Sequence, residues 1–442
     1  MNQPDHIQKN NTPHYLATVL LFAPLFFQRV FVGAAGSSYS EYPGFSLSFL
    51  GYIAHLALIV LALLYPHNRG PQIKKSILLL FLALFCILSL THLYLTSTTT
   101  EFTFLELILP LGRGWLWILA IAVYCLFYFT DEIFVRIFTQ FCKIAALVLV
   151  ISIISFWLLD FPFGVHINNG YPRVQGFLSE PSTLAPIFPT FAILSLLRRK
   201  WADFSLALGC TLLTASVIVY TVFIGISVSY LLYYKNFIRT FSTFVFIYVF
   251  LIVSVVLIPL KNILESTSKV APPIISWIEE HDGSISHHYH LLKELVSRSD
   301  HIAIYDLGNT GVWARLFGSI VTAEELRVNG LQNIGFGLNV YGYMAIDRYG
   351  DILDFGLFPY LMSSFGIPLA VLITFVLAYS VIKKIKNKSS IGIIFLGFFF
   401  STLLNSAGGI HSYSALMVCL FSLVAKALPS SLSKQGIYPN AR

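Results

Sequence analysis

The chain has 442 residues, of which 56% are hydrophobic and only 11% are charged, and its mean hydropathy is +0.76. Soluble globular proteins carry roughly 25% charged residues, so this composition excludes a soluble fold of this size, a disordered chain, a fibrous repeat and a disulfide scaffold. The net charge of +7 does not indicate nucleic-acid binding, because most lysines and arginines stand in short loops between apolar runs. The composition predicts an all-α polytopic membrane protein.

Apolar runs divide the chain into candidate helices. Because 56% of 442 residues is about 248 and a bilayer span takes roughly 20 apolar residues, about 12 transmembrane helices are expected. Gln28 and Arg29 interrupt the first run before any cleavage site, which favours a retained helix over a signal peptide. The runs lie near residues 15–35, 45–65, 76–95, 104–129, 142–159, 183–197, 203–219, 220–234, 241–260, 355–382, 390–405 and 411–428.

The stretch 203–234 is either one long helix or two short spans. One helix would place the basic clusters at 198–200 and 235–239 on opposite faces of the membrane, whereas two spans place both on the same face. Lysines and arginines of short loops favour the cytoplasm. The charge pattern therefore predicts two short spans.

This choice fixes the orientation of the whole chain, with both termini in the cytoplasm. The predicted organisation is nine helices within residues 1–260, a large loop domain at 261–350 on the opposite side of the membrane, and three helices with a cytoplasmic tail within 351–442. A short loop at 160–182 faces the same side as the large domain. The expected cytoplasmic basic residues are Lys9, Arg69, Lys74, Lys75, Arg136, Lys143, Arg198, Arg199, Lys200, Lys235, Arg239, Lys383, Lys384, Lys386, Lys388, Lys426, Lys434 and Arg442.

The segment 261–350 is the one region with the composition of an ordinary soluble protein. Loops of this length are usually functional or disordered, and its apolar periodicity favours an ordered domain. A helix is expected from Asn309 as N-cap to Gly330 as its C-terminal stop.

The loop at 170–182 carries the densest chemical signal. A helix that begins at Pro181 would aim free N–H groups at the external surface, which makes an anion site, and Arg173 would add a bidentate phosphate donor. In the alternative interpretation, Glu180 caps the helix and pairs with Arg173. The residues that define the loop are Arg173, Gly176, Glu180, Pro181 and Ser182.

A second signal is Arg315, which precedes a Gly-Phe-Gly sequence at 335–337. Arg315 falls on the polar side of the predicted helix, where a solvated charge is the simpler interpretation. Arg327 and Arg348 lie in the same external segment and are equally good candidates by composition. Arg348 is retained as a substrate-binding candidate.

Arg113 lies inside an apolar run, where a charged side chain usually faces a cavity or a partner. Pro110 and the flanking glycines suggest a broken or re-entrant helix at this point, and Glu106 is a candidate partner. The alternative is that Arg113, like Arg29, extends its guanidinium to the membrane interface.

Metal and nucleotide chemistry are not expected. The cluster of His281, His287, His288 and His290 lacks the ligand spacing of a zinc site, and all five cysteines lie in or beside apolar runs. The chain contains no nucleotide-binding loop. His411 stands at the external end of a late span and is an acid–base candidate, although a helix-capping role explains it equally well.

Together these motifs resemble the Wzy-type O-antigen polymerase family. The resemblance rests on Arg173-x-x-Gly176-x-x-x-Glu180-Pro181-Ser182, on Arg315 followed by Gly-Phe-Gly at 335–337, and on an apolar helix that opens with Tyr360-Leu361 and Phe365-Gly366-Ile367. It covers roughly residues 70–425.

The resemblance implies a C-type glycosyltransferase that polymerises undecaprenyl-pyrophosphate-linked oligosaccharide repeats at the periplasmic face. Arg173 and Arg315 would neutralise the pyrophosphate leaving group, so no metal or other cofactor is required, and Glu180 would act on the sugar hydroxyl. The expected partners are the lipid-linked oligosaccharide and the bilayer, and the resemblance also allows a chain-length regulator protein. No nucleic acid is expected.

One departure concerns the related ligases, which carry a His-Asn pair about eleven residues before the glycine that matches Gly366. Here that position holds Phe355-Gly356 after Asp354, so the histidine is absent. The general base stays open among Glu180, Asp351, Asp354 and His411. The alternative functions are an O-antigen ligase and, from a different class, a lipid-linked oligosaccharide flippase or other transporter.

Overall fold

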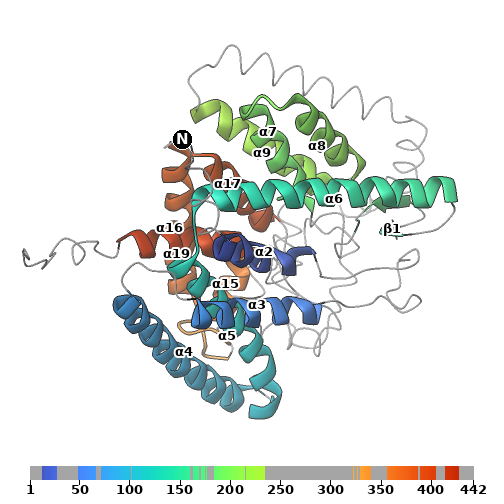
Figure 1. Ribbon diagram of the computed structural model, residues 1–442. Helices are drawn as coiled ribbons and strands as arrows, with labels where there is room; N and C mark the ends of the chain where they lie inside the picture. Colours follow the sequence, from blue (N-terminus) through green and yellow to red (C-terminus); the bar gives the residue numbers. More distant parts are fainter. Residues whose placement is uncertain are drawn as a thin grey trace, which may run out of the picture.

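The computed structural model describes a bundle of helices with one small hairpin (Figure 1). It describes residues 12–26, 48–65, 71–100, 102–159, 163–168, 171–174, 176, 184–214, 216–233, 322, 326, 329–338, 340, 356–386, 389–404 and 414–427. Most of the expected loop domain at 261–350, and the expected span at 241–260, therefore lie outside the described residues.

The described elements follow the apolar runs of the sequence. The helices are α2 (Thr12–Phe26), α3 (Ser48–Leu64), α4 (Pro71–Thr99), α5 (Phe104–Phe127), α6 (Asp131–Leu159), α7 (Phe188–Leu197), α8 (Trp201–Leu213), α9 (Val217–Tyr233), α15 (Leu357–Phe365), α16 (Ile367–Lys386), α17 (Ser390–Leu404) and α19 (Ser414–Ala427), and the strands are β1 (Val165–Asn168) and β2 (Tyr171–Val174).

Three of these helices are long and apolar enough to cross a membrane, namely Phe104–Phe127, Asp131–Leu158 and Ile367–Ile385. Six shorter apolar helices accompany them in the described part of the chain. The protein is thus a helical membrane-associated protein, as its composition predicts. The total of about 12 spans stays a prediction from apolar length.

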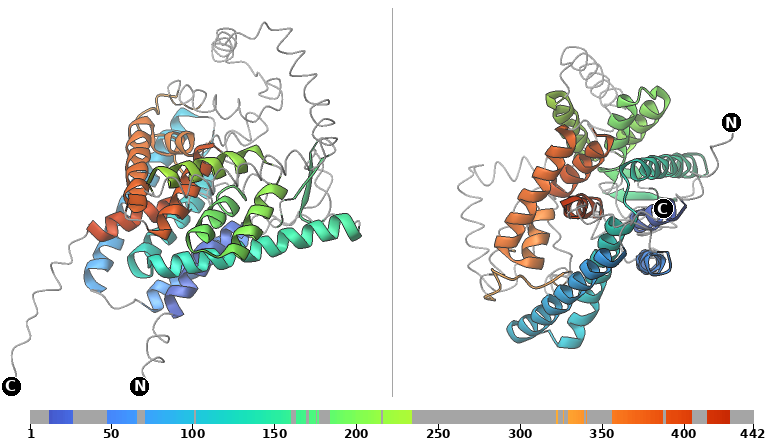
Figure 2. Two further views of the ribbon diagram at one scale, coloured as in Figure 1. Left: turned by 90° about the horizontal axis from the view of Figure 1, so that it is seen from above. Right: turned by 60° about the vertical axis from the view of Figure 1, so that its left-hand side comes forward.

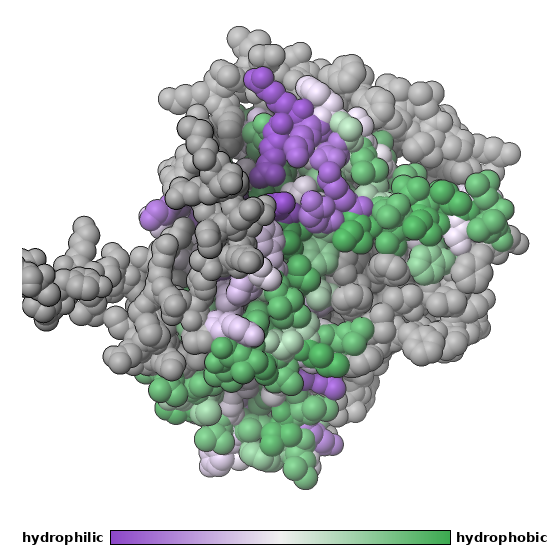
Figure 3. Space-filling model, in the orientation of Figure 1, coloured by the Kyte–Doolittle hydropathy of each residue, from purple (hydrophilic) through white to green (hydrophobic). Residues whose placement is uncertain are grey.

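Large side chains are buried at the centre of the bundle, and other large apolar side chains are exposed on its outer faces. Trp117 and Tyr124 of α5 are fully buried, whereas Leu105 of the same helix is 77% exposed. Figure 3 shows hydrophobic surface over α4, α5 and the C-terminal half of α6. A membrane environment accounts for this surface, because apolar side chains cost free energy when they are exposed to water but not when they are exposed to lipid.

The split of 203–234 is confirmed at the level of the helices, since α8 ends at Leu213 and α9 begins at Val217. The predicted end of a helix at Gly330 is also confirmed. Gly330 has φ +67° and the Leu331 N–H donates to the Leu326 carbonyl at 2.8 Å, which is the Schellman pattern. The expected start of that helix at Asn309 lies outside the described residues.

Two expectations about helix continuity are wrong. The run 355–382 is not one helix, because Gly366, with φ +82°, separates α15 from α16. Conversely, α5 is continuous through Pro110 and Arg113, so no re-entrant break occurs there. A proline removes one hydrogen bond from a helix, and contacts with neighbouring helices can keep the helix continuous in spite of this loss. Pro110 is buried.

Candidate functional site

The segment expected to be a loop at 160–182 contains an antiparallel hairpin. β1 and β2 pair in the register Val165↔Val174, His166↔Arg173, Ile167↔Pro172 and Asn168↔Tyr171. Arg173 therefore lies on a strand, directly opposite His166. The sequence analysis missed this hairpin and His166, although Asn169-Gly170 between two short strands is a strong hairpin signal.

Two glycines close the base of the hairpin where it comes close to α6. The Gly176 N–H donates to the Gly164 carbonyl at 3.0 Å, and both residues have positive φ, of +64° and +62°. A Cβ on Gly164 would lie 2.5 Å from Ser152 Oγ of α6, and one on Gly176 would lie 3.3 Å from Val148 Cγ1. Figure 2 shows the hairpin beside the C-terminal half of α6. The glycine of the Arg-x-x-Gly motif therefore closes the base of the hairpin that carries Arg173, at the place where the hairpin packs on α6.

The predicted helix start at Pro181 falls on residues that the structure does not describe, so it stays a prediction. Residues 184–187 form a tight turn and α7 begins at Phe188, after Ile187 and with Pro189 in its first turn. Proline favours the first helical turn because its missing N–H has no partner there, and Pro189 meets that condition. Glu180, Pro181 and Ser182 lie outside the described residues, and so does the side chain of Arg173.

The Gly-Phe-Gly sequence at 335–337 forms a turn that lies against the break between α15 and α16. The Phe336 N–H donates to the Ser363 carbonyl at 2.6 Å, and the Ile367 N–H donates to the Gln332 carbonyl at 2.8 Å. A Cβ on Gly335 would lie 2.6 Å from the Phe365 nitrogen. The two parts of the second motif, which are distant in the chain, are therefore in direct backbone contact.

Two residues of α4 hold the same turn from the other side. His92 Nε2 lies 3.1 Å from the Ile334 carbonyl, and Thr96 Oγ1 donates to the Phe336 carbonyl at 2.9 Å. Both side chains are buried. The sequence analysis did not single out either residue, and polar side chains within an apolar run are the signal that could have found them.

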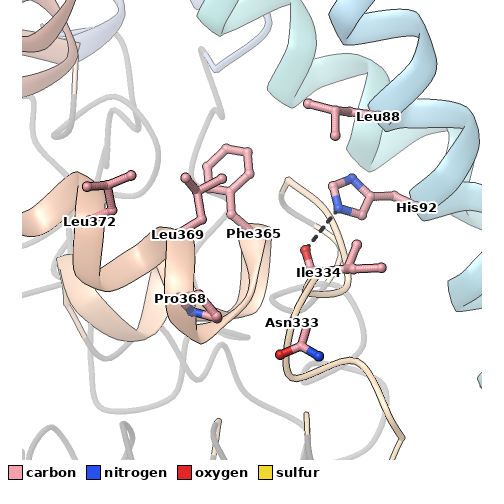
Figure 4. Close-up of a pocket in the computed structure, with 8 residues that line it drawn as sticks. All are labelled: Leu88, His92, Asn333, Ile334, Phe365, Pro368, Leu369 and Leu372. Atoms are coloured by element: carbon pink, nitrogen blue, oxygen red, sulfur yellow. Dashed lines mark hydrogen bonds between the residues drawn. The ribbon is translucent and has the colours of Figure 1, made fainter.

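A pocket of about 340 Å³ lies where the turn meets these helices. Figure 4 shows its lining side chains, which come from α4, the two residues before the turn, the end of α15 and the start of α16. They are Leu88, His92, Asn333, Ile334, Phe365, Pro368, Leu369 and Leu372. The pocket is apolar apart from one imidazole and one amide.

Arg113 is exposed on α5 and does not pair with Glu106, so the predicted pair is wrong. The Arg113 guanidinium lies over the Tyr52 ring of α3, 5.4 Å from its centroid, which is a cation–π contact. Glu106 accepts hydrogen bonds from the backbone N–H and the hydroxyl of Thr103 at 2.7 and 2.8 Å, in the capping box of α5.

The other candidates of the sequence analysis lie outside the described residues. The general-base and substrate-binding candidates among them are Arg315, Arg348, Asp351, Asp354 and His411, and the histidine cluster comprises His281, His287, His288 and His290. Whether Arg315 and Arg173 converge is therefore a prediction from the motifs.

Comparison of the chain with protein-family models and with curated proteins gives no match.

Proposed function

We propose that this protein polymerises lipid-linked oligosaccharide repeats at the external face of a bacterial inner membrane. The observation that supports the proposal most directly is the hairpin, because Arg173 lies on a strand of a hairpin that Gly176 and Gly164 close and that packs on α6. An arginine that clamps a leaving pyrophosphate must be held in place before the reaction. The second motif is also held in place, because backbone hydrogen bonds join the Gly-Phe-Gly turn to the α15–α16 break.

The proposed reaction transfers a growing glycan from undecaprenyl pyrophosphate to a sugar hydroxyl of another lipid-linked repeat. The hydroxyl oxygen attacks the anomeric carbon, the bond to the pyrophosphate oxygen breaks, and a base accepts the hydroxyl proton. Arg173 and Arg315 neutralise the pyrophosphate charge that develops. The base is one of Glu180, Asp351, Asp354 and His411.

The deletion phenotype tests the proposal. A strain without the polymerase carries single repeats on its lipid A core, whereas a strain without a ligase or flippase carries no attached glycan. Electrophoresis of lipopolysaccharide from the deletion strain separates these results. Absence of any attached repeat would reject polymerisation and favour one of the two alternative functions.

Conservative arginine variants test the clamp. Arg173→Lys and Arg315→Lys keep the charge but remove the bidentate fork, so we expect chain elongation to fall by about tenfold or more, equivalent to ~1.4 kcal/mol. Arg327→Lys, in the same external segment as Arg315 but outside both motifs, is the matched control. Normal polymer length with both motif variants would show that these arginines do not form the clamp.

A further inference from the structure

The pocket beside the Gly-Phe-Gly turn is a groove between two helices that face lipid. Leu88 on one wall belongs to α4, and Leu369 and Leu372 on the other wall belong to α16. These leucines are 38%, 40% and 56% exposed. The groove therefore opens on the apolar outer surface of the bundle, where hydrocarbon chains and not water are the available occupants.

The floor of the groove carries no charged side chain among the residues that line it. A carbonyl oxygen only accepts hydrogen bonds, so the His92 Nε2 that faces the Ile334 carbonyl is the protonated nitrogen. Within the described part of the chain no group hydrogen-bonds His92 Nδ1, which is buried. A second proton there would leave a buried donor without a partner, so the imidazole is neutral.

A neutral apolar groove suits a hydrocarbon chain and not a pyrophosphate. Its volume of about 340 Å³ falls within the range of small-molecule sites, roughly 300–1,000 Å³. Its floor is formed by Asn333 and Ile334, directly before the Gly-Phe-Gly turn (Figure 4). An occupant of the groove therefore lies next to the turn that belongs to the second motif of the proposed function.

We propose that the groove between α4 and α16 binds the polyprenyl chain of the lipid-linked substrate and so aligns that substrate with the turn. This inference rests on the proposed function, because the turn belongs to its second motif. Phospholipid acyl chains share the hydrocarbon chemistry, so the experiment has to distinguish the two sources.

Photolabelling of the full-length protein in phospholipid nanodiscs tests this site. The probes are an undecaprenyl phosphate analogue with a diazirine on its chain and a phosphatidylglycerol with a diazirine on one acyl chain. We expect the polyprenyl probe to label peptides from 82–98 and 357–386, and unlabelled undecaprenyl phosphate to compete for this labelling. The phosphatidylglycerol probe should label only the lipid-facing outer surfaces of these helices, so the same competitor should not change its labelling.

A tryptophan placed in the groove supplies the matched comparison. Leu372 lines the groove and Val371 does not, yet the two adjacent side chains are 56% and 52% exposed. The larger tryptophan side chain would fill space that the polyprenyl chain needs, so Leu372→Trp should lower polyprenyl labelling by about tenfold. Val371→Trp should leave the labelling unchanged.

Equal labelling of the two tryptophan variants, or loss of polyprenyl labelling to excess phospholipid, would overturn the inference. The deletion phenotype decides the proposed function separately. Specific polyprenyl labelling in a protein whose deletion leaves no attached glycan would retain the groove and reject polymerisation. The polymerase phenotype without specific labelling would retain the function and reject the groove.

Discussion

At the scale of single residues, a glycine decides how the second motif fits the bundle. Gly366 has φ +82°, and a Cβ there would lie 2.6 Å from the Asn333 oxygen and from the Ile334 nitrogen. An alanine would therefore meet an unfavourable backbone conformation and fixed backbone atoms at once. The α15–α16 break and the turn can approach this closely only with glycine at 366.

Gly366→Ala should destabilise the protein strongly, by about 3 kcal/mol, because it combines a left-handed backbone term with steric overlap. Gly330→Ala is the matched control, since φ is +67° there but nothing lies within 4 Å of a Cβ, and it should cost about 1–2 kcal/mol. Thermal unfolding of detergent-purified variants measures both. Equal unfolding temperatures for the two variants would contradict the proposed close contact.

Thr96 provides a second prediction at this scale. Thr96→Val removes the hydroxyl that donates to the Phe336 carbonyl at 2.9 Å, and should lower the free energy of unfolding by about 1 kcal/mol. Thr98→Val removes an exposed hydroxyl that donates to the Tyr94 carbonyl of its own helix, so its effect should stay within about 0.5 kcal/mol. Chemical unfolding of the two variants compares them, and a larger effect at Thr98 would refute this role for Thr96.

At the scale of elements, an ion pair joins the start of α6 to the end of α16. Lys384 Nζ lies 3.1 Å from Asp131 Oδ2. Asp131 stands in the first turn of α6 and Lys384 in the last turns of α16, so each charge also complements the dipole of its own helix. Lys384 is largely buried, whereas the Asp131 side chain is 40% exposed.

Lys384→Met keeps the aliphatic stem and removes the charge. Breaking a fully buried pair costs roughly 3–5 kcal/mol, and the exposure of Asp131 reduces the expected loss to about 1–2 kcal/mol. The control is Lys383→Met, because Lys383 is exposed on the same turn. Unfolding temperatures should fall for the first variant alone, and a comparable fall for both would reject a specific α6–α16 pair.

The helices and the hairpin differ in how clearly the sequence predicts them. Apolar length predicted the positions of α3, α5 and α17 within a few residues, because a backbone in lipid must satisfy its hydrogen bonds within the helix. The hairpin had a local signal in Asn169-Gly170 that the analysis of the loop overlooked. The α15–α16 break also had a local signal, since Gly366 followed by Pro368 is a typical helix stop. The structure adds the close contact of Gly366 with residues 333–334.

At the scale of the whole molecule, the orientation rests on the distribution of basic residues. The hairpin should face the periplasm and the 198–200 cluster the cytoplasm, because short loops rich in lysine and arginine remain inside. Cys86 is the exposed member of the five free cysteines, so Cys86→Ser gives a background for site-directed labelling.

In that background, Asn168→Cys should react with a membrane-impermeant maleimide in intact cells. Lys200→Cys should react only after the membrane is permeabilised. Mass-shift electrophoresis after labelling reads both results. The reverse pattern would invert the predicted topology and place the hairpin in the cytoplasm, where the proposed substrate chemistry could not occur.

The sequence by itself determined that this is a helical membrane protein, because apolar composition and the position of charges depend only on the solvent around each segment. Tertiary structure decided how the motifs are supported. Gly176 and Gly164 close a hairpin that packs on α6, and His92 and Thr96 hold the Gly-Phe-Gly turn from α4. These contacts join residues far apart in the chain and depend on close approach of backbones, a property that no local pattern of residue types encodes.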